Sequence, residues 1–409
     1  MVDICFYFQV HQPDRIRKDY RITDIGHNPF YLDEKANREI FIKVANKCYL
    51  PTVHVLKQLV EETHGAFKCS FSFSGTFLDQ AERFAPEVLY AFQDLIKTGC
   101  AEVLSETYYH SLAFLYSIDE WKEQITKHKN RVKELFNVTP QIFRNTELIY
   151  SNWIGDQVSQ MGYKAMLAEG VDWNLGWKSP NYVYNNVIKP EFKLLLKNYK
   201  LSDDIAFRFS NRAWKEWPLT AEKYVNWLDF AGLDGNIVNL FMDFETFGEH
   251  QWADTGIFDF MKHMPHKALA KGHHWFITPS EAVEKFSSVG PYDAHNLTSW
   301  ADMERDLSAW RSNRLQEDAL SKIYSLEHRI KRLNDPELLE IWRRLTTSDH
   351  FYYMCTKYYS DGDVHQYFSP FETPYEAYIA YLNVISDLKL RIEKKENSLK
   401  NISNTLVNA

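Results

Sequence analysis

The sequence lacks several features that mark broad classes of protein. Its 409 residues contain no apolar stretch of 18 residues, and no basic cluster precedes the apolar residues at the start. We therefore expect neither a membrane-spanning helix nor a secretory signal peptide. Positive charge is in deficit, with a net charge of −8, which argues against a nucleic-acid partner. The absences together favour a cytoplasmic protein with no membrane or nucleic-acid partner.

Cysteine is scarce and shows no pattern typical of zinc ligands or disulfide frameworks. The number is odd, and three of the residues fall in or beside apolar runs, so we expect buried free thiols. The cysteines are Cys5, Cys48, Cys69, Cys100 and Cys355. Four histidines, His263, His266, His273 and His274, lie around a basic helix. We expect no carboxylate to lie near them as an oriented partner, and therefore no metal site there.

Apolar runs of strand length alternate with longer segments of helical periodicity. The expected strands are 4–10, 68–74, 101–107, 141–146, 164–169, 192–200 and 236–243. This alternation is typical of parallel βαβ units, and seven such strands favour a closed barrel, although an open sheet fits the same pattern. A short strand at 275–277 and a helix beginning at Pro279 follow.

Composition changes near residue 290, and from about residue 297 the pattern is helical. The expected helical segments are 302–332, 336–359 and 374–400. We therefore expect a catalytic barrel over residues 1–290 and a helical domain over residues 291–409 that contributes to the active-site cleft. Trp300, Trp310 and Trp342 are expected in the core of the helical bundle.

Two of the expected strands lead directly into acidic residues. The strand 236–243 ends in Asp243, with Glu245 two positions on, and Glu147 follows the strand 141–146. The carboxyl ends of strands carry the chemistry of α/β barrels. Two carboxylates from different strands can act as acid, base or nucleophile on a glycosidic bond. For either strand alone, the alternative that an acid merely marks the end of the buried run stays open.

The neighbours of these acids suit the same chemistry. Arg144 precedes Glu147 by three residues, and a nearby cation would keep that carboxylate ionised, as a nucleophile requires. Asp243 and Glu245 would face the same way in a strand. Close carboxylates disfavour joint ionisation, so one pKa rises, as a general acid requires.

Polar side chains also follow the first and third expected strands. His11 and Gln12 could hydrogen-bond sugar hydroxyls, and the segment 99–110 contains Glu102, Glu106 and His110. Within a late helix, Asp349 and Tyr352 flank a histidine and a phenylalanine.

Taken in order, these segments resemble glycoside hydrolase family 57, the α-amylase and 4-α-glucanotransferase type. Five short segments mark that family, and the chain has a candidate for each. The candidates are residues 11–13, 99–102, 144–147, 243–248 and 349–352.

The resemblance implies a (β/α)7 barrel, which is an incomplete TIM-like barrel, with a C-terminal α-helical bundle. It implies double displacement with retention on α-glucans such as maltooligosaccharides, without a metal or another cofactor. Glu147 would be the nucleophile and Asp243 the acid/base, roughly 5–5.5 Å apart, with Glu245 raising the pKa of Asp243. The substrate contacts that it implies are His11, Gln12, Glu102, His110, Arg144, Glu245, Asp349 and Tyr352.

Three positions depart from the family pattern. Gln9 stands where many members have histidine, and Arg144 and Tyr352 each stand where many have tryptophan. Preferred glucan length and linkage are therefore open. So are a 4-α-glucanotransferase using the same intermediate and an inactive amylase-like protein that only binds carbohydrate. A metal-dependent deacetylase on a related barrel is a further alternative, but such enzymes usually need an Asp-Asp pair after the first strand.

Overall fold

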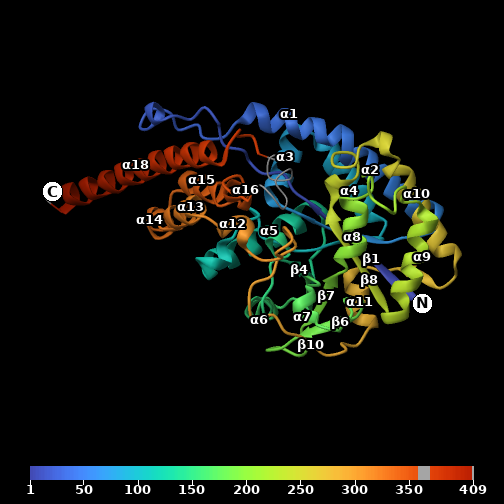
Figure 1. Ribbon diagram of the computed structural model, residues 1–409. Coiled ribbons are helices and arrows are strands. Elements are labelled where there is room, and N and C mark those ends of the chain that lie inside the picture. Colours follow the sequence, from blue (N-terminus) through green and yellow to red (C-terminus); the bar gives the residue numbers. More distant parts are fainter. Residues whose placement is uncertain (358–368, 408–409) are drawn as a thin grey trace. The chain divides into compact units, whose positions relative to one another are not determined.

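The computed structural model describes residues 1–357 and 369–407, with side chains described up to residue 401 (Figure 1). The chain divides into two compact units. The barrel unit comprises Met1–Gln12, Arg38–Tyr108 and Ile125–Trp300. The helical unit comprises Pro13–Asn37, Tyr109–Gln124 and the chain from Ala301 onward. The helical unit therefore draws two segments from the first third of the sequence, besides the C-terminal region.

Seven parallel strands make up the main sheet of the barrel unit. Pairing runs from β4 through β5, β7, β8, β1 and β2 to β3, and a single bridge between Ser105 and Phe143 returns it to β4. The pairing of β7 with β8 is also short, with Lys197 opposite Asn239. The seven strands are β1 (Val2–Val10), β2 (Cys69–Phe73), β3 (Ala101–Val103), β4 (Ile142–Arg144), β5 (Ala165–Glu169), β7 (Lys193–Lys197) and β8 (Ile237–Asp243).

Three shorter strands extend this sheet. β9 (His274–Phe276) pairs in parallel with the start of β1. β6 (Val183–Asn186) runs antiparallel to β7, and β10 (Pro291–Tyr292) pairs with β6.

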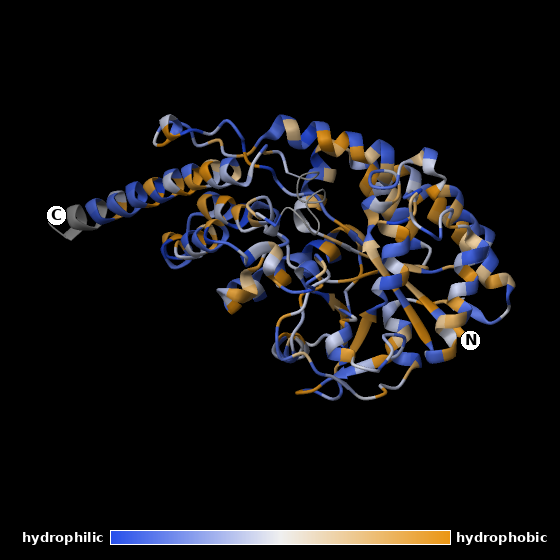
Figure 2. Cartoon of the chain, in the orientation of Figure 1, coloured by the Kyte–Doolittle hydropathy of each residue, from blue (hydrophilic) through white to orange (hydrophobic). Residues whose placement is uncertain are grey.

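Alternation along the strands creates two apolar layers, because successive side chains point to opposite faces. One set of alternate residues forms an inner cluster that includes Tyr7, Leu104 and Phe241. The other set, including Phe6 and Phe71, packs in a larger cluster with the surrounding helices. Strands buried on both faces read as continuous apolar runs, which is why the strands are largely orange in Figure 2.

Helices follow the strands and bury one apolar stripe each. Side chains fix where several begin: Ser74 caps α3, and Thr278 and Glu281 form a capping box at the start of α11. The helices are α2 (Leu50–Glu62), α3 (Gly75–Phe84), α4 (Pro86–Lys97), α6 (Asn152–Gln160), α7 (Asp172–Leu175), α8 (Tyr199–Ala206), α9 (Ala221–Ala231), α10 (Ile257–Ala270) and α11 (Pro279–Lys285). Two more, α1 (Glu34–Val44) and α5 (Ile118–Phe136), begin in segments of the helical unit and continue into the barrel unit.

The helical unit is built around the long C-terminal helix. Its helices are α12 (Ser308–Arg311), α13 (Arg314–Tyr324), α14 (Glu327–Leu333), α15 (Pro336–Leu345), α16 (Ser348–Tyr352) and α18 (Pro374–Val407). α13, α14 and α15 all pack on α18. Trp310 and Trp342 are buried in this unit, and the indole N–H of Trp342 donates to the carbonyl of Ile323 at 2.8 Å.

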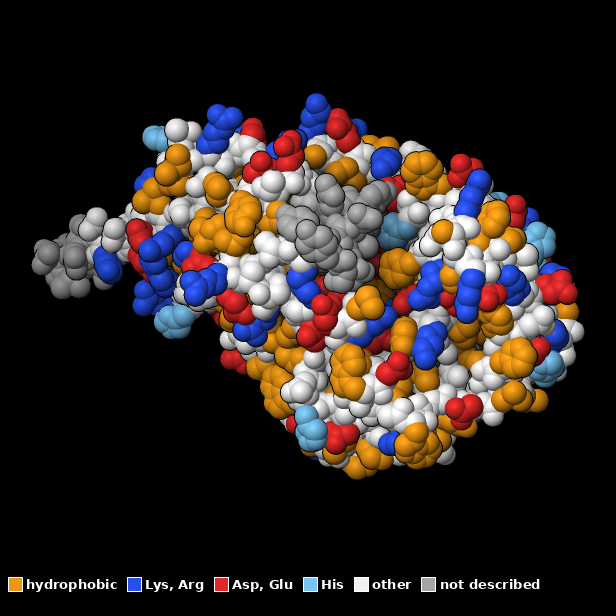
Figure 3. Space-filling view, viewed as in Figure 1, with side chains coloured by type: hydrophobic (Ala, Val, Ile, Leu, Met, Phe, Trp, Pro, Cys, Tyr) orange, Lys and Arg blue, Asp and Glu red, His pale blue; other side chains and the backbone are white. Residues whose placement is uncertain are grey.

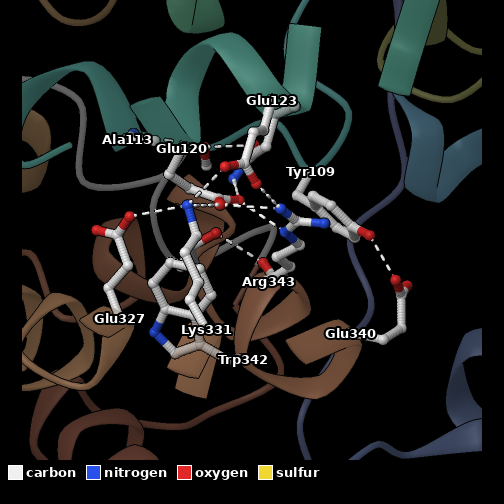
Figure 4. A network of polar contacts seen from close by, with 12 residues as sticks. Tyr109, Ala113, Glu120, Glu123, Glu327, Lys331, Glu340, Trp342 and Arg343 are labelled. Atoms are coloured by element: carbon white, nitrogen blue, oxygen red, sulfur yellow. Dashed lines mark hydrogen bonds and ion pairs between the residues drawn. The ribbon is translucent and has the colours of Figure 1, made fainter. Parts of the chain in front are cut away.

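A charged network ties the segment Tyr109–Gln124 to the rest of the helical unit (Figure 4). The buried carboxylate of Glu120 accepts two hydrogen bonds from Arg343, at 2.8 and 3.0 Å. Lys331 lies 2.9 Å from Glu120 and 3.1 Å from Glu123. A buried carboxylate is tolerated when cations surround it in this way, so the network compensates for burying Glu120.

The secondary structure expected from the sequence is confirmed for all seven main strands, the short strand β9 and the helix at Pro279. The helical region after the barrel is confirmed too, but 302–332 is broken into three helices and 336–359 contains two, α15 and α16, which end at Tyr352. Two residues of the expected helix 336–359, 358 and 359, lie outside the described residues. The expectation for Trp300 is wrong, because Trp300 belongs to the barrel unit and not to the bundle.

The surface carries charges of both signs, as a composition with 47 Lys and Arg and 55 Asp and Glu residues leads one to expect. On the face shown in Figure 3, acidic and basic side chains are interspersed over both units. Within the part of the chain that the structure describes, no helix is both long enough and apolar enough to cross a membrane.

Candidate active site

On each of the seven main strands, the last inward-pointing side chain at the carboxyl end is polar. Six of these side chains stand two residues after an apolar member of the inner cluster, and the seventh, Ser72, stands two residues after Ser70; each therefore points to the same side of its strand as that residue. In the order of strands around the ring they are Glu106, Arg144, Glu169, Lys197, Asp243, Gln9 and Ser72. All but the half-buried Asp243 are buried. The carboxyl edge of the barrel thus concentrates charge where the apolar interior ends.

Tyr7 links three of these positions. Its hydroxyl donates to Oε1 of Gln9 at 2.8 Å and lies 2.6 Å from the Ser72 hydroxyl. The Gln9 amide in turn donates to Oε1 of Glu106 at 2.8 Å. Burial raises the pKa of Tyr7, the charge of Arg144 lowers it, and the charge of Glu106 raises it. Gln9, which departs from the family pattern, is therefore a fixed part of this edge.

Glu147 sits in an unusual backbone conformation just after β4. Its φ is 56° and that of Leu148 is 52°, within the short 3₁₀ turn η4 (Thr146–Leu148). Two consecutive side-chain-bearing residues in the left-handed region are uncommon, and such strain is concentrated at functional sites. The indole N–H of Trp300 donates to Oε2 of Glu147 at 2.7 Å, and the Ser299 hydroxyl donates to the Glu147 carbonyl at 2.9 Å. The turn and these donors together fix the direction of the carboxylate.

Arg144 reaches the same carboxylate indirectly. Its guanidinium carbon lies 4.8 Å from the centre of the Trp300 ring, whose indole holds Glu147. The Arg144 side chain is fully buried, and none of its three side-chain nitrogens has a hydrogen-bond partner among the described residues. The N–H groups of the buried Arg144 guanidinium can therefore donate to the oxygen atoms of a ligand.

Lys197 lies on the same tryptophan from another strand. Its Nζ is 5.3 Å from the Trp300 ring centre, 3.0 Å from Asp203 and 3.7 Å from Glu169. Cations near an indole ring are attracted to its face. Trp300 is therefore held by contacts with two cations and fixed by its bond to Glu147.

Asp243 and Glu245 lie near each other, but not as neighbours in one strand. β8 ends at Asp243, and Phe244–Thr246 form the 3₁₀ turn η6. Burial, and after it the charge of Asp243, raise the pKa of the Glu245 carboxyl to about 8. A raised pKa is thus found on Glu245, and the raised pKa that the sequence suggested for Asp243 stays a prediction.

A chain of hydrogen bonds connects Glu245 to the end of β1. The Tyr49 hydroxyl donates to Oε1 of Glu245 at 2.6 Å, and the Gln12 amide donates to the Tyr49 oxygen at 3.0 Å. The His11 ring nitrogen Nδ1 lies 2.7 Å from the Ser74 hydroxyl. The structure therefore joins Gln12 to Glu245 through Tyr49, with His11 next to Gln12 in the chain, while their contact with substrate stays a prediction.

Glu102 lies away from this edge. It is the second residue of β3, where it accepts a hydrogen bond from the Ser280 N–H at 2.9 Å. Burial raises the pKa of its carboxyl, and the bonds from Ser280 lower it. It lines a surface pocket formed by residues that precede β3 and β4 and by the start of α11. Glu106, four residues on, is the acid of this strand that reaches the carboxyl edge, and the two-residue period of the strand pointed to it.

The remaining predicted contacts belong to the helical unit. The Ser348 N–H donates to the His110 carbonyl at 2.9 Å, which places α16, with Asp349 and Tyr352, against the segment that carries His110. The Tyr352 ring lies 6.1 Å from that of Trp310. The structure thus brings His110, Asp349 and Tyr352 together within this unit.

The histidines of the α10 region have carboxylate neighbours after all. His266 lies 2.9 Å from Glu62, and both His273 and His274 lie 2.7 Å from Asp229. The expectation that no carboxylate lies near them is wrong, because the acids come from distant parts of the chain.

Comparison with known proteins agrees with this arrangement. The model of the family described as glycosyl hydrolase family 57 matches residues 5–295. The chain belongs to glycosyl hydrolase family 57. It is 43% identical over 405 residues to a presumed alpha-amylase of Methanocaldococcus jannaschii, an alignment that covers 96% of this chain and 85% of that protein.

Solved structures of the family share the fold at low sequence identity. A branching enzyme of the same family from Pyrococcus horikoshii superposes with a TM-score of 0.68 at 15% identity, over 97% of this chain and 94% of that one. The 4-alpha-glucanotransferase of Thermococcus litoralis gives a TM-score of 0.64 at 15% identity, over 86% of this chain and 56% of that one. The chain is thus a family 57 enzyme whose α/β barrel and helical region have counterparts of known structure.

Proposed function

We propose that this protein is a retaining glycosidase acting on α-1,4-linked glucans, with Glu147 as the nucleophile and Asp243 as the acid/base. The observation that carries the proposal is the geometry of Glu147: a left-handed turn and the Trp300 indole aim and fix its carboxylate. An N–H donor favours the ionised form that attacks an anomeric carbon. The family relatives, described as an alpha-amylase, a glucanotransferase and a branching enzyme, support an α-glucan as the substrate.

The reaction takes two steps. Glu147 attacks the anomeric carbon while Asp243 protonates the leaving glycosidic oxygen, which gives a covalent glycosyl-enzyme. Asp243, now a base, removes a proton from water, whose oxygen bonds to the anomeric carbon as the bond from that carbon to Glu147 breaks. The sugar leaves with its original configuration and Glu147 is again a free carboxylate. If a sugar hydroxyl takes the place of water, the same intermediate gives transfer. The separation of the two carboxyl groups, roughly 5–5.5 Å for retention, stays a prediction.

The surrounding residues suit sugar recognition. The donors of Arg144 lie near Trp300 and Glu147, and the Gln9–Glu106 pair presents an amide and a carboxylate at the same edge. We place a substrate contact at Glu106 rather than at Glu102. Contributions from His110, Asp349 and Tyr352 stay predictions.

One observation speaks against the deacetylase alternative. Asp14, the acid nearest to the end of β1, lies 2.6 Å from Arg344 in the helical unit. An acid held by an arginine in this way is a poor candidate for a metal ligand after the first strand. The alternatives kept are 4-α-glucanotransferase activity and sugar binding without turnover.

The test is turnover of maltoheptaose with analysis of the products. Glu147→Gln should abolish turnover, and Asp243→Asn should lower it by about 10²–10⁴-fold. Glu284→Gln, at an exposed glutamate, is the matched control and should leave turnover unchanged. Products longer than maltoheptaose would indicate transfer, and short ones hydrolysis.

A trapping experiment separates the proposed roles. A slowly reacting fluorinated α-glucosyl fluoride should leave a sugar on the peptide that contains Glu147, detected by mass spectrometry. A label on another residue would refute the assignment of the nucleophile. Calorimetric binding of maltoheptaose without any product from the wild-type protein would favour a binding protein instead.

A further inference from the structure

Two adjacent histidines and one aspartate form a cluster at the start of β9. Nε2 of His273 and Nε2 of His274 each lie 2.7 Å from the same oxygen, Oδ1 of Asp229 in α9. The three ligand atoms lie within 4.8 Å of one another. His274 is buried, while about a third of the side chains of His273 and Asp229 is exposed, so solvent reaches the cluster. All of these residues belong to the barrel unit.

Each imidazole ring has a backbone carbonyl at its second nitrogen. Nδ1 of His273 lies 3.0 Å from the carbonyl of Lys271, and Nδ1 of His274 lies 3.2 Å from the carbonyl of Val2. A carbonyl only accepts, so the Nδ1–H tautomer of each ring can donate to it. In that tautomer the lone pair belongs to Nε2, on the side of Asp229. An Nδ1–H bonded to a backbone carbonyl is the arrangement that orients histidines as metal ligands.

The three side chains converge on one point. Nε2 of both rings faces Oδ1 of Asp229, and Nζ of Lys271 lies 3.1 Å from the other carboxylate oxygen, Oδ2. A cation bound by the two nitrogens and Oδ1 would therefore leave the contact between Lys271 and Oδ2 in place.

We propose that Asp229, His273 and His274 form a site for a divalent transition-metal ion, for which Zn²⁺ is the best-suited probe. Two nitrogens and one oxygen suit zinc, whereas magnesium and calcium prefer oxygen ligands alone. Zinc bonds of about 2.0–2.2 Å in a tetrahedral site separate neighbouring ligand atoms by roughly 3.3 Å. The present 2.7 Å contacts need to open by only about half an ångström, a small movement for two partly exposed side chains.

The location assigns the ion a structural role. Asp229 lies in the last turn of α9, His273 directly precedes β9 and His274 begins it, and His274 lies 3.2 Å from the carbonyl of Val2, which starts β1. The ion would fasten a helix and two strands at the amino end of the barrel, opposite the edge that carries Asp243. It should therefore raise thermal stability and leave the proposed turnover of glucans unaffected, so that the two proposals fail independently.

Binding is tested on metal-stripped protein without a histidine tag. Titration calorimetry with ZnCl₂ should give one saturable site, and the melting temperature should rise with zinc but not with Mg²⁺ or Ca²⁺. His273→Ala should weaken zinc binding by at least about tenfold and abolish the rise in melting temperature. His266→Ala, at an exposed histidine that also faces a carboxylate, is the matched control and should behave like wild type.

A spectroscopic readout covers the case in which a variant folds poorly. Co²⁺ added to the wild-type protein should give the visible absorption of four-coordinate cobalt, and zinc should remove it. Asp229→Asn, which keeps the size of the side chain, should also lose that absorption. Zinc binding that is equal in wild type and in folded His273→Ala, or the lack of a saturable site in wild type, would overturn the proposal.

Discussion

Replacing Glu245 with glutamine should change how the stability of the protein depends on pH. The Glu245 carboxyl is buried, accepts a hydrogen bond from Tyr49 at 2.6 Å, and has its pKa raised to about 8 by burial and by the charge of Asp243. The folded protein therefore holds a proton on Glu245 over a range of pH in which the unfolded chain has already released it. Stability falls with rising pH wherever the folded state binds more protons.

The size of the effect follows from the shift. Between the ordinary pKa of 4.5 and about 8, each pH unit should cost the wild-type protein about 1.4 kcal/mol of unfolding free energy. From pH 5.5 to pH 7.5 this amounts to about 2.7 kcal/mol. Glutamine carries no charge, and its oxygen can still accept from Tyr49. Glu245→Gln should thus equal wild type near pH 4.5 and become progressively more stable than wild type as the pH rises.

The assay is urea denaturation at a series of pH values between 5 and 8, followed by tryptophan fluorescence. The informative quantity is the difference in unfolding free energy between the variant and wild type, because other titrating groups cancel in it. Glu284→Gln, at an exposed position, should show a difference that does not vary with pH. A Glu245→Gln difference that stays flat across this range would refute the reasoning.

Three further outcomes follow from the contacts of the barrel. Trp300→Phe keeps a ring for the neighbouring cations but removes the N–H that binds Glu147, so kcat on maltoheptaose should fall by about 10–100-fold with little change in KM, as measured by steady-state kinetics. Lys197→Met removes the cation between the buried acids Glu169 and Asp203 and should lower the unfolding free energy by about 3–5 kcal/mol in urea. Unchanged kcat or unchanged stability, respectively, would contradict these two expectations. The five cysteines are free and buried, so a thiol reagent should react with none of them in the native protein and with all five in denaturant; rapid native labelling would contradict the burial.

The strands were readable from the sequence because parallel strands buried on both faces leave continuous apolar runs. β8 is the clearest case, with seven residues that end in Asp243. β6 and β10 carry no such run: β6 is Val-Tyr-Asn-Asn, and β10 has two residues. Segments this short and polar become strands because they pair with a neighbouring strand. The residues of the segment itself do not indicate that pairing, so the sequence does not predict it.

The site was readable only where neighbours in sequence are neighbours in space. The turn at Glu147 and the sequence around Asp243 fall into this class. The bond from Trp300 to Glu147 spans 153 residues, and no periodicity connects them. For the third strand, the motif directed attention to Glu102, whereas counting in twos from Glu102 leads through Leu104 to Glu106 at the active edge. The motif and the period of the strand thus point to different acids, and the substrate contact of Glu102 stays an untested prediction.

The distribution of charge around the barrel rim has a consequence for the chemistry. In strand order the rim alternates in sign from Glu106 through Arg144, Glu169 and Lys197 to Asp243. Each cation therefore has acids on both neighbouring strands, which is how buried charges become tolerable. In the first step Asp243 carries the proton that it gives to the leaving oxygen, so Glu106 and Glu169 balance the two cations of the rim, and Glu147, just after β4, adds one negative charge. The transition state of glycoside cleavage resembles an oxocarbenium ion, and fixed negative charge stabilises it without reorganisation. The same alternation that lets the barrel bury its charged rim thus leaves Glu147 as the net negative charge that the proposed reaction needs.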